Sequence, residues 1–208
     1  MLRDLKDEAL MERYRGGDVR AFEVLFDRHR RSVYSFILKY VSDQGRAEEI
    51  LQETFLRVIK KQRTFKRRSK FSTWLYTIAR NLCIDKLRRM KHRKARSLDQ
   101  PLKRDEKDGQ KLYDKIPGKD RDAESSVLDC EIRQRVEEAV AQLPDDQKEV
   151  FLLREVSRLP FKEIAEVVGC PENTVKSRMR YALERLRKSL SDFEAVVRPQ
   201  VGEQVGRG

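Results

Sequence analysis

Cysteine and histidine are scarce in this 208-residue sequence, and their positions argue against the sites that they most often build. The three cysteines Cys83, Cys130 and Cys170 are far apart, and only His29 and His92 accompany them. An odd number of isolated thiols does not fit a disulfide framework or a structural zinc site. We therefore expect no metal and no cofactor, and reduced thiols as in the cytosol.

Glycine, proline and long apolar runs are also few. With nine glycines and six prolines, helices should dominate the fold. The first residues alternate charged and apolar side chains, so they do not form the apolar core of a signal peptide, and no run is long enough to span a bilayer. The sequence predicts a protein that is made and kept in the cytoplasm.

Positive charge is what the sequence has in excess, with a formal net charge of +12. Residues 1–98 carry 26 lysines and arginines against 12 acidic residues, a net charge of +14. Residues 99–129 have a net charge of −2, and residues 130–208 are neutral. The N-terminal half therefore has the charge expected of a polyanion-binding domain.

Helical spacing of apolar residues predicts three helices in the N-terminal half. The first starts at the N-cap Asp18 and reaches Tyr40, the second follows Gly45 and reaches Ile59, and the third starts at FSTWLYTIAR near residue 71. The second helix is predicted to bury a stripe of Ala47, Ile50, Leu51, Thr54, Phe55, Val58 and Ile59. The third is predicted to bury Trp74, Leu75, Ile78, Ala79, Leu82 and Leu87.

Residues 99–126 lose this periodicity and mix charges of both signs with proline and glycine, which predicts a flexible linker. Periodicity resumes at Val127 and predicts four more helices, the first with Ile132 and Val136 in its buried stripe. We therefore expect an all-α fold of two small helical domains, residues 1–98 and 127–192, joined by the linker and followed by a frayed tail at 193–208.

Residues 160–190 have the pattern of a helix-turn-helix. Pro160 opens a helix that Gly169 ends in a left-handed conformation, and Pro171 prevents its continuation. A second helix starts near Glu172, and its inward residues are Val175, Met179, Ala182, Leu183, Leu186 and Leu190. The outward set is Lys176, Ser177, Arg178, Arg180, Tyr181 and Arg185, which matches a recognition helix in a major groove. The alternative is a helical hairpin with a solvated basic face.

Three segments resemble the bacterial sigma-70 family. GRAEEILQETFLRVIKKQRTF at 45–65 and FSTWLYTIARNLCIDKLRR at 71–89 are similar to regions 2.2 to 2.4, and the segment from LPDDQKEVFLL to YALERLR is similar to region 4. No segment resembles regions 1.1 or 3, as in the extracytoplasmic-function (ECF) group. The resemblance implies a sigma factor that binds core RNA polymerase through the β′ clamp helices and the β flap. It also implies promoter DNA and an anti-sigma factor as partners.

The resemblance assigns roles to three sets of residues. Polymerase docking falls to an acidic helix face, which could otherwise be an ordinary solvated face: Glu48, Glu49, Gln52 and Glu53. Capture and reading of the −10 element fall to Phe65, Lys66, Arg67, Arg68, Ser69, Lys70, Phe71, Asn81, Arg88 and Arg89. Reading of the −35 element falls to Thr174, Lys176, Ser177, Arg178, Arg180, Tyr181 and Arg185. Thr77 and Ile78 stand where housekeeping sigma factors carry a pair of aromatic residues that opens the duplex.

Two other functions compete with this interpretation. A helix-turn-helix regulator could act as a dimer without being a polymerase subunit, but it does not need the N-terminal motifs. An enzyme such as a nucleic-acid hydrolase would require clustered carboxylates or histidines, which this basic surface does not offer. We expect no catalytic residues and no small-molecule substrate.

Overall fold

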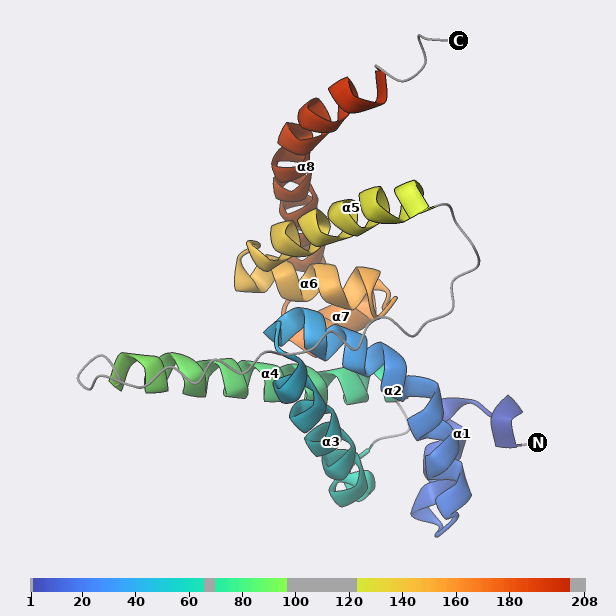
Figure 1. Ribbon diagram of the computed structural model, residues 1–208. Helices are drawn as coiled ribbons and strands as arrows, with labels where there is room; N and C mark the ends of the chain where they lie inside the picture. The colour runs from blue at the N-terminus through green and yellow to red at the C-terminus, as the bar shows by residue number, and fades with distance from the viewer. Residues whose placement is uncertain (1, 66–69, 97–122, 203–208) are drawn as a thin grey trace.

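The computed structural model describes residues 2–65, 70–96 and 123–202, and every regular element in these residues is a helix. The N-terminal half contains η1 (Leu2–Asp4), α1 (Asp7–Arg15), α2 (Val19–Val41), α3 (Gln44–Lys60), η2 (Gln62–Thr64) and α4 (Phe71–Arg96). The C-terminal half contains α5 (Ala123–Ala141), α6 (Asp145–Glu155), α7 (Phe161–Val168) and α8 (Glu172–Gly202). The predicted all-α fold in two helical groups is confirmed, with α1 to α4 in the lower part of Figure 1 and α5 to α8 above them.

Two boundaries differ from the predicted domain limits. Helix α5 begins at Ala123, inside the predicted linker, and α8 continues to Gly202, inside the predicted tail. The rest of the linker, from 99 to 122, lies outside the described residues. None of the helices in the described ranges is long and apolar enough to cross a membrane.

The break between α2 and α3 falls earlier than the sequence predicted. Ser42 adopts a left-handed conformation with φ 55° after the last turn of α2. Asp43 then caps α3, because its Oδ1 accepts a hydrogen bond from the Arg46 N–H at 2.9 Å. The prediction that Gly45 separates the two helices was wrong, since Gly45 lies in the first turn of α3.

Helix α1 was not predicted, and its contacts explain why it forms. Leu10 and Met11 are fully buried, and α1 packs against α2 and α4. The Asp7 carboxylate binds Arg28 and lies 2.7 Å from His29 Nε2. Burial raises the pKa of Asp7, but the hydrogen bonds and charges of His29 and Arg28 outweigh it, so that the pKa is lowered. Glu8 Oε1 accepts a hydrogen bond from the Phe71 N–H at 3.1 Å and thus caps α4.

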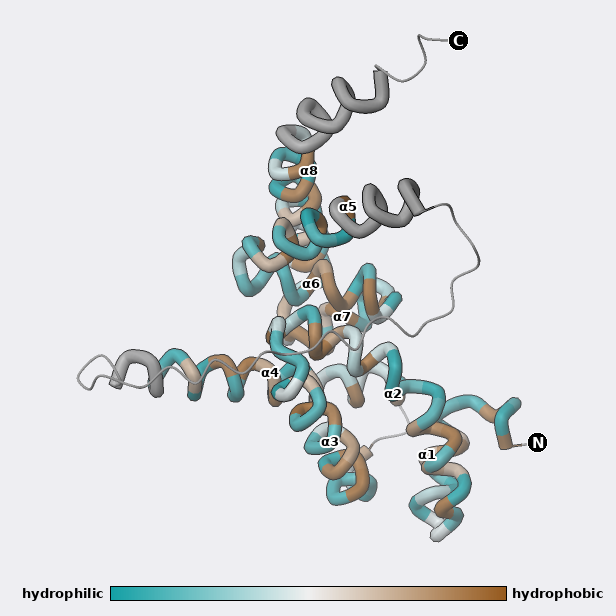
Figure 2. Tube along the Cα trace, viewed as in Figure 1, coloured by the Kyte–Doolittle hydropathy of each residue, from teal (hydrophilic) through white to brown (hydrophobic). Residues whose placement is uncertain are grey.

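The C-terminal half contains the predicted helix-turn-helix. Gly169 has φ 73° and ends α7 in the left-handed region, as its position predicted. Helix α8 then begins at Glu172 and buries Val175, Met179, Ala182 and Leu186. In Figure 2 apolar and polar residues are interleaved along the helices, as the periodicity of amphipathic helices requires.

Four residues predicted to be buried are exposed instead: Ile59, Ile132, Val136 and Leu183. Each has the correct helical spacing, but none is covered by another helix in the described part of the chain. Ile132 and Val136 lie on α5 and Leu183 on α8, two helices that pack against each other. The C-terminal half therefore has these three large apolar side chains exposed to solvent.

Candidate functional site

The acidic face of α3 is accessible. Glu48, Glu49 and Gln52 are exposed and Glu53 is half-buried, which places the four predicted docking residues on one side of the helix. Glu53 Oε1 accepts a hydrogen bond from Arg57 Nε at 3.0 Å, and Glu49 pairs with Lys86 of α4. Among the described residues, Glu48 accepts a hydrogen bond only from the neutral Gln44, at 3.2 Å. Part of the negative charge of this face is thus neutralised within the N-terminal half, whereas Glu48 forms no ion pair with the described residues.

Residues 66–70, which we call the basic loop, are flanked by two phenylalanines that do not face solvent. Phe65 and Phe71 are buried, with ring centroids 6.0 Å apart, and both pack against Trp74. The prediction that they bind −10 DNA is therefore corrected: they fix the two ends of the loop in the core. Lys70 is exposed, whereas Lys66, Arg67, Arg68 and Ser69 lie outside the described residues.

Helix α4 carries the other residues predicted to contact the −10 element. Asn81, Arg88 and Arg89 are all exposed. Both arginines lie in the C-terminal half of α4, and the C-terminal part of this helix projects beyond the other helices in Figure 1. Thr77 donates its hydroxyl hydrogen to the Thr73 carbonyl at 2.8 Å, and Ile78 is buried. These two positions hence supply no exposed aromatic ring that could separate the strands.

Most of the predicted −35 residues form one exposed basic face of α8. Lys176, Ser177, Arg180, Tyr181 and Arg185 are exposed, and Thr174 is half-buried. Lys176 forms an ion pair with Glu172 at 2.7 Å, and the Arg180 guanidinium lies over the Tyr181 ring at 4.9 Å from its centroid.

Arg178 differs from its neighbours because its side chain is only 28% exposed. Its Nε lies 3.2 Å from Asp146 Oδ2, and its Nη1 lies 3.6 Å from Glu149 Oε1. Both carboxylates belong to α6. The sequence did not indicate these partners, since they are about 30 residues away and the outward position of Arg178 on the helix suggested solvent.

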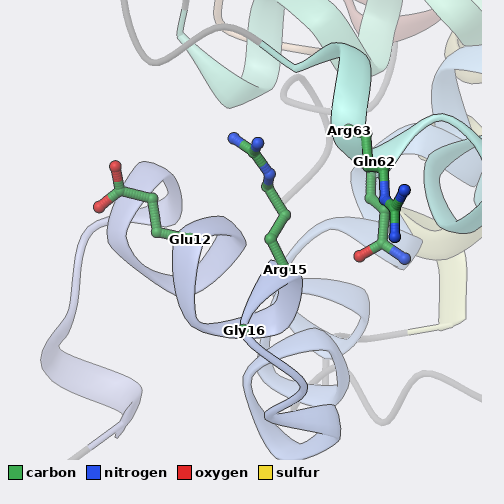
Figure 3. Close-up of a pocket in the computed structure, with 5 residues that line it drawn as sticks. All are labelled: Glu12, Arg15, Gly16, Gln62 and Arg63. Carbon is green, nitrogen blue, oxygen red and sulfur yellow. The ribbon is translucent and has the colours of Figure 1, made fainter.

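A polar cavity of about 410 Å³ lies between the end of α1 and η2, next to the start of the basic loop. It is lined by Glu12, Arg15, Gly16, Gln62 and Arg63, and Figure 3 shows the arginines on different elements. Two guanidinium groups suit phosphate, whereas no cysteine or histidine lines this cavity. Cys83 is buried elsewhere in the core, and burial raises the pKa of its thiol to about 12. It is therefore protonated and unreactive at neutral pH.

Comparison with known proteins finds matches to both halves of the chain. Residues 25–93 match the family Sigma-70 region 2, and residues 133–186 match Sigma-70, region 4. The chain is 33% identical over 177 residues to the ECF RNA polymerase sigma factor SigW of Bacillus subtilis, covering 85% of this chain and 92% of the relative. It is 32% identical over 193 residues to the RNA polymerase sigma-H factor of Pseudomonas aeruginosa, covering 91% and 96%.

The fold also resembles two solved structures. One is RpoE of Bartonella quintana, solved with the anti-sigma factor NepR, with a TM-score of 0.62 and 24% identity over 82% of this chain and 96% of that chain. Another is CnrH, solved with the cytosolic domain of CnrY, with a TM-score of 0.64 and 20% identity over 89% and 97%.

The chain belongs to the ECF sigma factors of the sigma-70 family. Its function is accordingly to bind RNA polymerase and direct initiation at promoters. The match to region 2 argues against a helix-turn-helix regulator that is not a polymerase subunit, because such a regulator would leave the N-terminal half without a role.

Proposed function

We propose that the two halves divide promoter recognition, with α4 and the preceding loop on the −10 element and α8 on the −35 element. The observation that carries this proposal is the opposite charge of two exposed faces in the N-terminal half. Helix α3 presents Glu48, Glu49 and Glu53, whereas α4 presents Arg88 and Arg89. Opposite charges on neighbouring helices suit two different partners, a basic protein surface and a polyanion.

The acidic face of α3 is the proposed docking site for the β′ clamp helices of core polymerase. Complementary charge would steer the association and fix its orientation more than it would raise affinity. Glu48 and Gln52 should contribute most directly, because both are exposed and neither forms an ion pair within the described residues. Glu49 is paired with Lys86 and Glu53 with Arg57, so both carboxylates would have to leave these ion pairs before they could bind basic groups of the polymerase.

A second polymerase contact is proposed at the apolar residues of the C-terminal half. Ile132, Val136 and Leu183 are between 37% and 46% exposed, on helices that pack against each other. Large apolar side chains of adjacent helices are a favourable surface for an apolar helix of a partner. We assign this surface to the β flap, which would hold the C-terminal half on the polymerase.

On the −10 element, α4 would act by capture of an extruded base and not by an aromatic wedge. Asn81 is exposed and its amide can pair with a Watson–Crick edge, while Lys70 and the basic loop would hold phosphates. Arg88 and Arg89 would continue this track along the backbone, each contact steepening the salt dependence by about 0.9 log units. Phe65 and Phe71 would keep the loop in place from the core.

On the −35 element, the exposed face of α8 would enter the major groove. Lys176 can donate to guanine O6 and N7, and Ser177 can reach a phosphate or a base. Arg180, Tyr181 and Arg185 follow on the exposed side of the helix and are available to the backbone. Arg178 can take part only after it has left Asp146 and Glu149.

We further propose that the protein is a non-catalytic subunit that acts in the cytoplasm, where it would meet both the polymerase and the chromosome. An anti-sigma factor would hold it inactive, and the similar structure of RpoE was solved in complex with such a factor, NepR.

Reconstitution with purified core polymerase tests the function. The holoenzyme is run on fragments of DNA from the protein's own genome, and the 5′ ends of the transcripts are mapped. Core polymerase supplemented with the chain should start at defined sites that share one element near −10 and another near −35. The same starts with core polymerase alone would contradict the proposal.

A further inference from the structure

The polar cavity between α1 and η2 has positive charge that its own side chains do not neutralise. Arg15 ends α1 and Arg63 lies in η2, and both side chains are exposed. Neither side chain forms a hydrogen bond or an ion pair with the residues that the structure describes. Residues 12–16 and 60–63 together carry five basic side chains against one carboxylate, that of Glu12. The cavity therefore attracts anions.

The helix ends account for Arg15 but not for Arg63. A cation in the last turn of a helix interacts favourably with the helix dipole, and Arg15 is the last residue of α1. The three-residue η2 has too few aligned peptide units for a comparable dipole. Arg63 is nevertheless brought to the same cavity as Arg15, because η2 packs against α1. The pair of guanidinium groups thus has no explanation in the stability of these two elements.

Gln62 adds an unused hydrogen-bond acceptor to the cavity. Its side-chain Oε1 is buried and has no hydrogen-bond partner among the described residues. Such atoms are rare in folded proteins, because a buried acceptor that has lost its water and gained no donor is costly. Figure 3 shows Gln62 and Arg63 extending together from η2, with Glu12 turned away on the other side of Arg15. A donor on a bound molecule would satisfy this oxygen.

The three side chains together match the chemistry of a nucleoside phosphate. Guanidinium groups bind phosphate oxygens through charge-assisted hydrogen bonds, and each of the two can donate a pair of them. The Gln62 oxygen can accept a hydrogen bond from a base N–H or a sugar hydroxyl. The volume of about 410 Å³ lies near the lower end of the range for ligand sites, about 300 to 1,000 Å³, which suits one nucleotide. No aromatic ring lines the cavity, so the base would be held without stacking.

We propose that this cavity is a binding site for one nucleoside phosphate, held by Arg15, Arg63 and Gln62. The nucleotide can come from two sources, a free nucleotide in solution or the single-stranded promoter. The second source rests on the proposed function, since the basic loop assigned to the −10 element follows η2 after Phe65. Both sources use the same phosphate contacts, so a free nucleotide and the promoter strand would displace each other.

The test compares a cavity variant with a control of equal charge. The cavity variant is Arg15→Gln with Arg63→Gln, and its fold should be intact because both positions are exposed. The control is Arg13→Gln with Arg20→Gln, which removes two exposed arginines of α1 and α2 that do not line the cavity. A third variant, Gln62→Met, removes the acceptor and keeps a side chain of similar size. Circular dichroism checks the helicity of all variants.

Equilibrium dialysis of the full chain without DNA measures binding of free ligands. The probes are the ribonucleoside 5′-monophosphates, the matching nucleosides and inorganic phosphate. At least one nucleotide should bind saturably and more tightly than its nucleoside or inorganic phosphate. The cavity variant should lose about tenfold in affinity, or 1.4 kcal/mol, and the control should not. Gln62→Met should weaken binding of the nucleotide but not of inorganic phosphate, and an equal affinity of the wild type for both ligands overturns the role of Gln62.

The second arm measures binding of a single-stranded oligonucleotide that carries the −10 element, over a range of salt concentrations. Loss of one phosphate contact should lower the salt slope by about 0.7 in the cavity variant, and the control should keep the wild-type slope. A loss confined to the oligonucleotide supports the promoter strand as the source, and a loss confined to nucleotides supports a free ligand. Losses in both assays, with mutual displacement, support a shared site.

Equal losses in the cavity variant and the control would assign binding to diffuse charge and overturn the proposal. Wild-type binding of nucleotide and oligonucleotide by the cavity variant would also overturn it. The dialysis uses the free chain, so its result does not depend on the proposed function, which transcription by the wild-type holoenzyme tests separately.

Discussion

Replacing Asn81 by alanine should impair promoter opening while leaving the fold intact. The side chain is exposed, and its contact with Arg80 Nη1 at 3.5 Å is at the outer limit of a hydrogen bond. The free energy of unfolding should therefore change by less than about 0.5 kcal/mol. Loss of the hydrogen bonds to an extruded base should cost about 1 to 3 kcal/mol. This corresponds to about 5-fold to 150-fold less open complex.

Permanganate footprinting on a duplex promoter and on the same promoter premelted at the −10 element measures this effect. Formation of the closed complex should be nearly unchanged, open complex should decrease, and the premelted template should restore part of the loss. Asp85→Asn is a suitable control, because Asp85 is also exposed one turn further along α4 and has no proposed role in base capture. If Asn81→Ala melts the duplex promoter as well as the wild type, base capture at Asn81 is wrong.

Three further predictions concern other surfaces. Glu53→Lys should weaken binding to core polymerase with normal helicity, and unchanged affinity in a titration against core would reject the α3 docking face. Lys176→Ala should cost about 1 to 3 kcal/mol at one base position of the −35 element if it reads a base, whereas equal weakening on all variants of the element would make it a phosphate contact. In a chain with Cys130→Ser and Cys170→Ser, the buried Cys83 thiol, with its pKa raised by burial to about 12, should react with a thiol reagent at pH 8 only after unfolding. Rapid reaction of the folded chain would show that the core opens around Cys83.

Local sequence alone determined most of the helices and the helix-turn-helix. Gly169 and Pro171 act within a few residues of their own positions, so the turn between α7 and α8 could be predicted without knowing what surrounds it. The spacing of apolar residues identified the long helices for the same reason. The short α1 had no comparable signal, because its stability depends on Asp7 and Glu8 reaching residues of α2 and α4.

Periodicity also specifies which residues share a helix face, but it does not determine whether another element covers that face. Ile132, Val136 and Leu183 have core spacing and are nevertheless exposed. Phe65 and Phe71, which flank a basic loop, are buried because Trp74 and the helices around them enclose both rings.

Only the tertiary structure decided which charges are available to DNA. Arg178 has the same outward helical position as its basic neighbours, yet Asp146 and Glu149 hold it. Glu149 lies 69 residues from Arg80 and would be assigned to solvent by its charge alone. Its burial between two arginines follows from the packing of α4, α6 and α8, because an ion pair between distant segments depends on where the fold places them and not on the residues beside them in the sequence.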